Sequence, residues 1–158
     1  MNKKSPHKNL TSKKTSRKIT ALLTTLLVTG LAGCAGTAPT NLGVSDNRLA
    51  PCPSSPNCVC SYDKDEGHTI LPIPLTGSTE DTKTALLTAL ETMGATVVSA
   101  QDQYVRSEFT SSLIGFVDDV EFYIEASGIQ VRSASRLGHS DFGANRKRIE
   151  SIRLALHP

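Results

Sequence analysis

The sequence predicts an α+β fold: a single domain over residues 51–158, in which a four-stranded antiparallel sheet carries two helices packed on one face, with a possible extra edge strand. Two segments place apolar residues at helical spacing, and four strand-like segments lie between them. Apolar residues make up 38% of the 158 residues and aromatic residues only 4%. This composition predicts a modest core and excludes a disordered chain or an integral membrane protein.

The first 33 residues predict a lipoprotein signal peptide. They hold seven Lys and Arg and no acidic residue, and an apolar run, Ile19–Leu31, follows the cations. This run is too short to span a hydrocarbon core of ~30 Å comfortably. It ends in Leu31-Ala32-Gly33-Cys34, which resembles the bacterial lipobox, where the Cys thiol accepts diacylglycerol before cleavage. A short transmembrane anchor with an incidental Cys is the alternative.

Lipidation at Cys34 predicts where the protein resides. Cys34 becomes the first residue of the mature protein, which is anchored to the lipid bilayer through its acyl chains. Ala35, rather than Asp, follows it, and in a Gram-negative host this favours the outer membrane, with the domain facing the periplasm. Residues 34–158 carry ten Lys and Arg against fifteen Asp and Glu, a net charge of −5. This balance disfavours nucleic acid as a partner, because such binding relies on neutralising phosphates.

Residues 34–50 are small and polar without a period, so they predict a flexible tether. A segment rich in Pro and Cys follows, which excludes a helix or a central strand. Cysteines in an oxidising compartment tend to form disulfides, and we expect Cys52 to pair with Cys58. Cys60 is then a free thiol or a second partner for Cys52. Together with His68 the three thiols could bind a metal, but their spacing is not a known zinc signature, so we expect none.

The segment between these cysteines and the four strands predicts one strand and one helix. His68–Leu75 is expected to be an edge strand, since its two prolines remove alternate donors on one side. Ser78 or Thr79 then caps a helix with a core-facing apolar stripe, and Gly94 ends it.

The four strand-like segments are Ala95–Ala100, Tyr104–Thr110, Val117–Ala126 and Ile129–Arg136. The last two flank Ser127-Gly128, which we interpret as the two-residue turn of a hairpin. With this turn Ile124 lies opposite Val131 and Asp119 lies opposite Arg136. One face of the hairpin is then mostly apolar, and the other is an acid–base lattice that we expect to face solvent.

A last helix is predicted over roughly Gly143–Leu156, capped by Asp141 or Ser140. Asn145-Arg146-Lys147-Arg148 places three cations in its first turns, where the helix dipole disfavours each by ~0.3–1 kcal/mol. We expect either an acidic cluster of the protein or an external anion to compensate.

These charged segments supply the candidate ligand-binding residues: Asp119, Glu121, Arg132, Arg136, Asp141, Asn145, Arg146 and Arg148. A structural network of cross-strand ion pairs, worth only ~0.2–1 kcal/mol each, is the alternative interpretation. The chain has no Gly-x-Ser-x-Gly elbow and no phosphate-cradling glycine loop. We therefore predict no catalytic residue and no cofactor.

Three segments resemble the bacterial and plastid domain-of-unknown-function 1499 family: Cys52-Pro53…Ser55-Pro56-Asn57-Cys58, Phe116–Phe122 and Val131–Arg148. The resemblance covers about Leu49 to Leu156. It implies a single domain and no particular reaction, because the activity of the family is not established. Cys60 stands where the family often has Ser, which leaves the one-disulfide pattern open in this chain.

Two functions are compatible with these features. In the first, the protein is a non-catalytic envelope lipoprotein that binds a polar or anionic partner (an envelope protein, a glycan or a lipid headgroup) through a patch of Arg132, Arg136, Arg146 and Arg148. In the second, it is a hydrolase-type enzyme that uses Asp119 or Glu121 as a base beside those arginines. A purely structural role is the third possibility. Buried, converging charges would favour a site, and a flat solvated lattice would favour a structural role.

Overall fold

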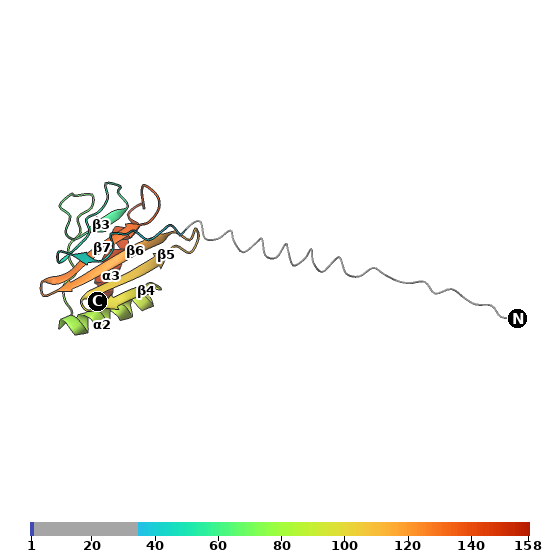
Figure 1. Ribbon diagram of the computed structural model, residues 1–158. Helices are drawn as coiled ribbons and strands as arrows, with labels where there is room; N and C mark the ends of the chain where they lie inside the picture. The colour runs from blue at the N-terminus through green and yellow to red at the C-terminus, as the bar shows by residue number, and fades with distance from the viewer. Residues whose placement is uncertain (2–34) are drawn as a thin grey trace. The chain divides into compact units, whose positions relative to one another are not determined.

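A computed structural model of the chain describes Met1 and residues 35–158 (Figure 1). The expected signal peptide and the lipidation site Cys34 lie outside the described residues. The described residues 35–158 group into one compact unit. Among the described residues, no helix has the length and apolar character needed to cross a membrane.

The fold is α+β, with a five-stranded antiparallel sheet in the order β3-β7-β6-β5-β4 and a separate two-stranded hairpin. The sheet strands are β3 (Cys58–Cys60), β4 (Thr96–Gln101), β5 (Tyr104–Thr110), β6 (Val117–Glu125) and β7 (Gly128–Ser135). The hairpin strands are β1 (Val44–Ser45) and β2 (Arg48–Leu49), and the helices are α2 (Thr79–Thr92) and α3 (Ala144–Leu156).

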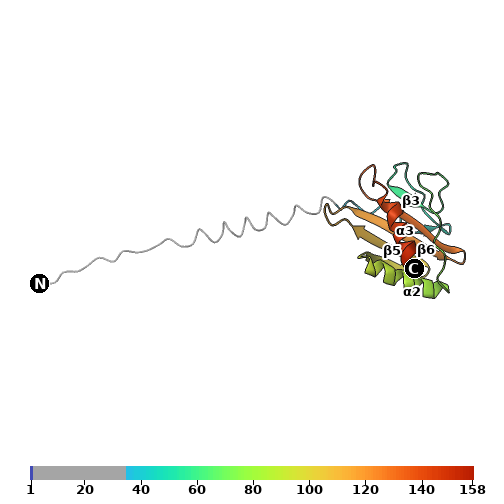
Figure 2. The ribbon, with the colours of Figure 1, turned by 180° about the vertical axis from the view of Figure 1, so that it is seen from behind.

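Both helices lie on one face of the sheet, as Figures 1 and 2 show from opposite sides. The core between these layers contains fully buried residues from each of them, among them Leu86 and Leu90 of α2, Phe122 of β6 and Ile149 of α3. Ser78 caps α2 as expected, because its hydroxyl accepts the Asp81 N–H at 3.1 Å. The predicted α+β class and the two helices are therefore confirmed.

The extra edge strand comes from a different segment than the sequence predicts. β3 pairs with β7 and places Cys58 opposite Ala134, whereas His68–Leu75 forms only isolated bridges, one of them between Ile73 and Ile129. Ile73 N–H donates to Ile129 O at 2.9 Å, and Ile129 N–H donates to Ile73 O at 2.7 Å. The prolines on either side of Ile73 have no N–H to donate, so the pairing cannot extend into a strand.

The β6–β7 hairpin is shifted by two residues from the predicted register. Glu125 pairs with Gly128, so the two-residue loop is Ala126-Ser127 rather than Ser127-Gly128. Ile124 consequently lies opposite Ile129, not Val131. A shift of two positions keeps every side chain on its predicted face, because strand side chains alternate with a period of two. The faces were therefore predicted correctly, and the cross-strand partners were not.

The second face of the sheet is covered by the segment before β3. Within it, β1 and β2 form a hairpin around Asp46 and Asn47, whose φ angles of 52° and 56° suit the type I′ turn favoured in two-residue hairpins. Leu49 at the end of β2 is only 3% exposed, and β2 contacts β6 and β7. The expected flexible tether of residues 34–50 thus includes a folded part, which we call the strap (residues 35–50).

Candidate functional site

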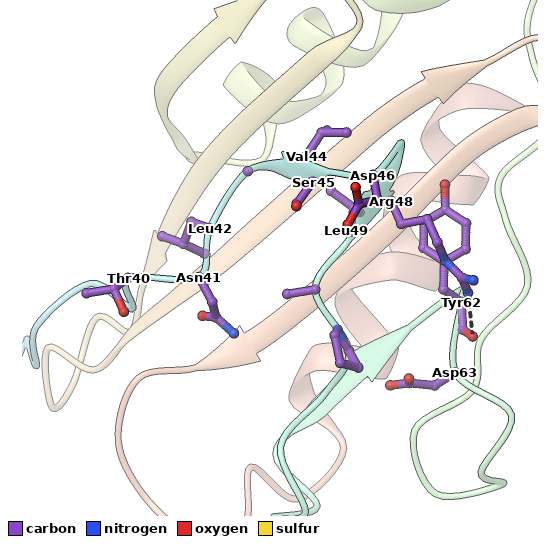
Figure 3. Close-up of a pocket in the computed structure, with 13 residues that line it drawn as sticks. Thr40, Asn41, Leu42, Val44, Ser45, Asp46, Arg48, Leu49, Tyr62 and Asp63 are labelled. Atoms are coloured by element: carbon purple, nitrogen blue, oxygen red, sulfur yellow. Dashed lines mark hydrogen bonds between the residues drawn. The ribbon is translucent and has the colours of Figure 1, made fainter.

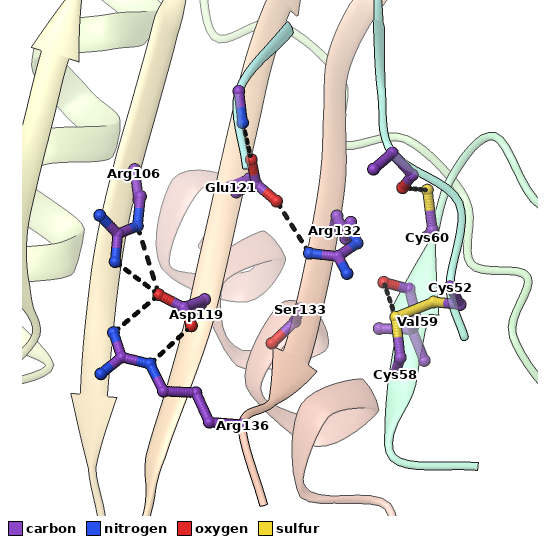
Figure 4. Close-up of polar contacts among 12 residues, drawn as sticks. Cys52, Cys58, Val59, Cys60, Arg106, Asp119, Glu121, Arg132, Ser133 and Arg136 are labelled. Atoms are coloured by element: carbon purple, nitrogen blue, oxygen red, sulfur yellow. Dashed lines mark hydrogen bonds and ion pairs between the residues drawn. A yellow bond between two sulfur atoms is a disulfide. The ribbon is translucent and has the colours of Figure 1, made fainter. Parts of the chain in front are cut away.

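The face beneath the strap holds a network of ion pairs centred on Asp119 (Figure 4). Asp119 Oδ1 accepts from Arg106 Nη2 at 2.7 Å and from Arg136 Nη2 at 3.0 Å, and Asp119 Oδ2 accepts from Arg136 Nε at 2.8 Å. Glu108 joins the network through bonds from Arg106, at 2.6 Å, and from Arg136. The carboxylate of Asp119 is therefore held between two guanidinium groups.

Glu121, two residues further along β6, is the second centre of the network. One carboxylate oxygen accepts the Tyr104 hydroxyl at 2.8 Å and the Gly43 N–H of the strap at 2.7 Å. The other accepts from Arg132 Nη1 at 2.9 Å. Glu121 thus connects β5, β7 and the strap from the centre of the sheet.

Burial distinguishes this network from the solvated lattice that the sequence predicts. Asp119 and Glu121 are 0% exposed, and Arg132 is 3% exposed. The expectation of a solvent-facing lattice is wrong because the strap covers this face. The sequence pattern of the strap does not predict that it folds. Charges removed from water in this way require pairing. Three arginines and three carboxylates supply it: Arg106, Arg132, Arg136, Glu108, Asp119 and Glu121.

The pairing also governs the ionisation of the network. Burial opposes ionisation of Asp119, but hydrogen bonds and charges from Arg136 and Arg106 outweigh it and lower the pKa of Asp119 below its ordinary value of 3.8. The hydrogen bond to Asp119 in turn raises the pKa of Arg136. For Tyr104, burial and the charge of Glu121 raise the pKa of the phenol. Asp119 consequently stays charged near neutral pH.

The cations at the start of α3 are compensated within the protein. Asp141 accepts the N–H groups of Gly143 at 3.0 Å and of Asn145 at 2.7 Å, so an internal carboxylate occupies the end of the helix where we considered an external anion. Arg148 donates to Asp118 Oδ2 at 2.5 Å and stacks on the Phe109 ring at 4.8 Å. Of the two expected explanations for cations at this end of the helix, compensation by acidic residues of the protein is the one that accounts for them.

Asn145 and Arg146 serve the packing of α3 against loops. The Asn145 amide donates to Asn57 O at 2.8 Å, and its oxygen accepts from Ser133 Oγ at 2.6 Å. Arg146 donates to Thr69 O at 2.8 Å and to Gly67 O at 3.1 Å. Each group satisfies polar atoms of a neighbouring segment.

The eight predicted ligand residues therefore fall into two groups rather than one patch. Asp119, Glu121, Arg132 and Arg136 belong to the network beneath the strap, and Asp141, Asn145, Arg146 and Arg148 belong to the start of α3. Sequence reasoning merged them because Arg132, Arg136 and the α3 cations are close in sequence.

A pocket of about 510 Å³ opens beside the first group. Arg132 and Arg136 line it together with the polar residues Ser55, Asn57 and Ser135, and no acidic residue lines it. The Nε atom of Arg132 is buried and has no hydrogen-bond partner among the described residues. In Figure 4 the Arg132 guanidinium lies between Glu121 and the Cys52–Cys58 disulfide. Two arginines that are paired with carboxylates therefore line this pocket, and one of them has an unused buried donor.

A second pocket, of about 600 Å³, is lined by the strap together with Pro51, Tyr62 and Asp63, and is shown in Figure 3. At the edge of this pocket, the Arg48 guanidinium lies over the Tyr62 ring, 4.6 Å from its centroid. Burial, and next the neighbouring carboxylate of Glu125, raise the pKa of Tyr62. Asp63 accepts the Cys52 N–H at 2.9 Å. Three polar groups of this pocket, those of Arg48, Tyr62 and Asp63, thus contact one another, the strap, Glu125 or the Cys segment.

The cysteines form the predicted Cys52–Cys58 disulfide, with a Cα–Cα distance of 5.7 Å. Cys60 is free and buried, and burial raises the pKa of its thiol. A thiol kept protonated and inaccessible is a poor nucleophile. Within residues 35–158 no group of three His, Cys, Asp or Glu side chains is arranged to hold a metal ion.

Several residues of the network were missed from the sequence. Arg106 and Glu108 alternate along β5, which places them on the same face as Tyr104. This period-two pattern was visible and could have identified them. Asn57 has no comparable signal, although its side chain donates to Gly138 O at 2.6 Å and thereby positions the pocket wall.

Comparison with protein families identifies the family of the chain. No curated protein matches the chain. The family described as "Protein of unknown function (DUF1499)" matches residues 48–156, which is more than half of the chain and includes β2 to α3. The disulfide and the charged side chains of the network lie within the matched residues, whereas Gly43 and two residues of the Arg132 pocket, Pro39 and Asn41, precede them. The chain therefore belongs to the DUF1499 family of proteins of unknown function.

Proposed function

We propose that the protein is an envelope lipoprotein, anchored by an acylated Cys34 and facing the periplasm from the outer membrane, whose domain binds an anionic group beside Arg132. The lipobox-like Leu31-Ala32-Gly33-Cys34 and the short apolar run before it support the anchor. The Cys52–Cys58 disulfide supports an oxidising compartment.

The buried, unpartnered Nε of Arg132 is the observation that carries the binding proposal. An unsatisfied buried donor on a charged group is costly, and native structures keep one where a ligand or water completes it. Arg132 already donates to Glu121 through Nη1, so the guanidinium is held in one orientation. A phosphate or carboxylate oxygen in the pocket of about 510 Å³ supplies the missing acceptor.

The geometry favours binding over the hydrolase alternative. Asp119 and Glu121 are both bonded to arginines and 0% exposed. Burial opposes the charge of Asp119, yet the arginines lower its pKa, which weakens it as a base near neutral pH. A carboxylate that already accepts bonds from two guanidinium groups has little capacity for a substrate proton.

Arg132→Lys is the variant that tests the binding proposal. Lysine keeps a cation beside Glu121, so the fold is preserved, but it removes Nε and the planar fork. Arg106→Lys is the matched control, because Arg106 belongs to the same network and does not line the pocket. The measurement is thermal unfolding of the mature lipidated protein with inorganic phosphate, glycerol phosphate and acetate at constant ionic strength.

We expect at least one of these anions to raise the unfolding temperature of the wild type and of Arg106→Lys, and to leave that of Arg132→Lys unchanged. Equal responses of all three proteins would contradict binding at Arg132. Absence of any response in the wild type would also contradict the proposal for phosphate and carboxylate groups.

A further inference from the structure

One end of the described domain exposes large apolar side chains on two loops. In the loop between β5 and β6, Leu113 is 92% exposed and Ile114 is 53% exposed. Between β7 and α3, Phe142 is 92% exposed and Leu137 is 41% exposed. Exposed apolar groups that gather on one surface mark sites of contact with a partner or a membrane.

The two loops form one surface. A pocket of about 390 Å³ is lined by Ile114 and Phe116 of the first loop and by Leu137 and Phe142 of the second. We call these four residues and Leu113 the apolar end patch. Phe142 adopts φ of 53°, an unfavourable conformation for a bulky residue, and the fold holds it there with the ring exposed.

The apolar end patch has almost no free charge. Residues 111–116 contain no charged side chain. Residues 137–142 contain one acid, Asp141, whose carboxylate accepts the N–H groups of Gly143 and Asn145. Asp118 and Arg148 also line the pocket, and they are paired with each other. Burying this surface in an apolar medium therefore costs little in desolvation of charge.

The start of the strap is adjacent to the same surface. Gly36 packs against the two residues that follow β7. A Cβ placed on Gly36 would lie 3.0 Å from Leu137 Cγ and 2.9 Å from Arg136 Cβ. Only two peptide units, of about 3.8 Å each, join Gly36 to Cys34. Figures 1 and 2 both show the start of the strap at the end of the sheet where β5 terminates.

We infer that the apolar end patch inserts into the interfacial layer of the bilayer to which Cys34 anchors the protein. The inference rests on the proposed lipidation of Cys34. A lipid attached two residues from Gly36 holds the membrane near this patch at a high effective concentration, which favours the bilayer over any soluble partner. Apolar side chains of surface-bound segments typically reach about 5–10 Å into the boundary of headgroups and acyl chains.

Docking in this way orients the rest of the molecule. Ser135 and Gly138 line both the pocket in the apolar end patch and the pocket beside Arg132. Insertion of the patch therefore brings the Arg132 pocket close to the level of the lipid headgroups.

The chain contains no Trp, so a single introduced Trp reports its own surroundings. Leu113→Trp and Phe142→Trp place the reporter in the patch. Leu71→Trp is the control, because Leu71 is 77% exposed and lies far from the patch. Its carbonyl accepts from Arg153, and the neighbouring Ile73 pairs with Ile129 near the turn of the β6–β7 hairpin, at the opposite end from the patch. Each protein is expressed from the full chain and purified in its mature, lipidated form, and the mass of the Cys34 peptide verifies the acyl chains. It is then reconstituted into phosphatidylethanolamine–phosphatidylglycerol vesicles with brominated acyl chains.

We expect the emission of Trp at positions 113 and 142 to shift to shorter wavelength and to be quenched most by bromine near the headgroup end of the chains. Trp at position 71 should be neither shifted nor quenched. A lipidated protein in which all three positions respond alike overturns the membrane-facing patch and leaves the lipoprotein proposal intact. A Cys34 peptide without lipid overturns both, because the anchor that brings the bilayer to the patch is then missing.

Discussion

Gly43 donates its backbone N–H to Glu121 Oε1 at 2.7 Å, across 78 positions of the sequence. This bond fastens the strap to a carboxylate that is 0% exposed on the central strand β6. The other oxygen of Glu121 is bonded to Arg132, so the fold of the strap and the orientation of the pocket arginine depend on one side chain.

Glu121→Gln should destabilise the protein by about 3–5 kcal/mol, because it leaves the Arg132 charge buried without a counter-charge. Urea unfolding measures the loss, and hydrogen exchange at Gly43 should accelerate if the strap loosens. Glu108→Gln is the control: Glu108 is 26% exposed, and the loss should be ~1 kcal/mol. Equal losses for the two variants would contradict the central position of Glu121.

Asp119 should make the protein sensitive to acid. Its folded-state pKa is lowered, so its contribution to stability is complete above the ordinary pKa of 3.8 and is lost as the pH falls through the lower folded-state value. Asp119→Asn should therefore be less stable than the wild type at neutral pH, and the difference should shrink as the pH falls below about 3.8. Thermal unfolding from pH 7 to pH 2 measures both curves, with exposed Asp102 changed to Asn as the control. A constant difference at all pH values would refute the assignment.

The disulfide should protect Cys52 and Cys58 from alkylation, and burial should protect Cys60. Native, unreduced protein should resist iodoacetamide at Cys60, which is 0% exposed. After unfolding without reductant, Cys60 alone among the described cysteines should react, as peptide masses will show. The double change Cys52→Ser and Cys58→Ser should cost about 2 kcal/mol, since the bridge closes only a short loop. A Cys52–Cys60 peptide would show that the pairing is wrong.

Cys34→Ala should release the protein from the membrane fraction or leave an uncleaved precursor, because the thiol that accepts the lipid is gone. Fractionation and radiolabelled palmitate measure both effects. Cys60→Ala serves as the control, since that buried thiol should not affect labelling. Normal processing and membrane retention of Cys34→Ala would end the lipoprotein proposal.

Local sequence patterns predicted much of the fold. Ser78 followed by an apolar stripe predicted the start of α2, and the structure confirms its capping bond. Alternation along β6 and β7 predicted which side chains share a face, and Phe122 is indeed in the core and Asp119 on the other face. The Cys52–Cys58 pairing was also predicted, because this bridge closes a small Pro-rich loop whereas Cys58 and Cys60 are too close for easy bridging. Each of these features depends on contacts between near neighbours in sequence.

Tertiary structure decided the rest. The two-residue shift of the β6–β7 register keeps both faces intact, so the face pattern alone could not distinguish the two registers. β3 rather than His68–Leu75 became the edge strand through pairing with β7, a contact between segments more than 70 residues apart. The strap turned a predicted solvated lattice into a buried network by folding over it. Burial decides whether charged residues such as Asp119 and Arg132 are structural ions or a binding site. The distant segment that covers these residues determines their burial, and no local sequence pattern carries that information.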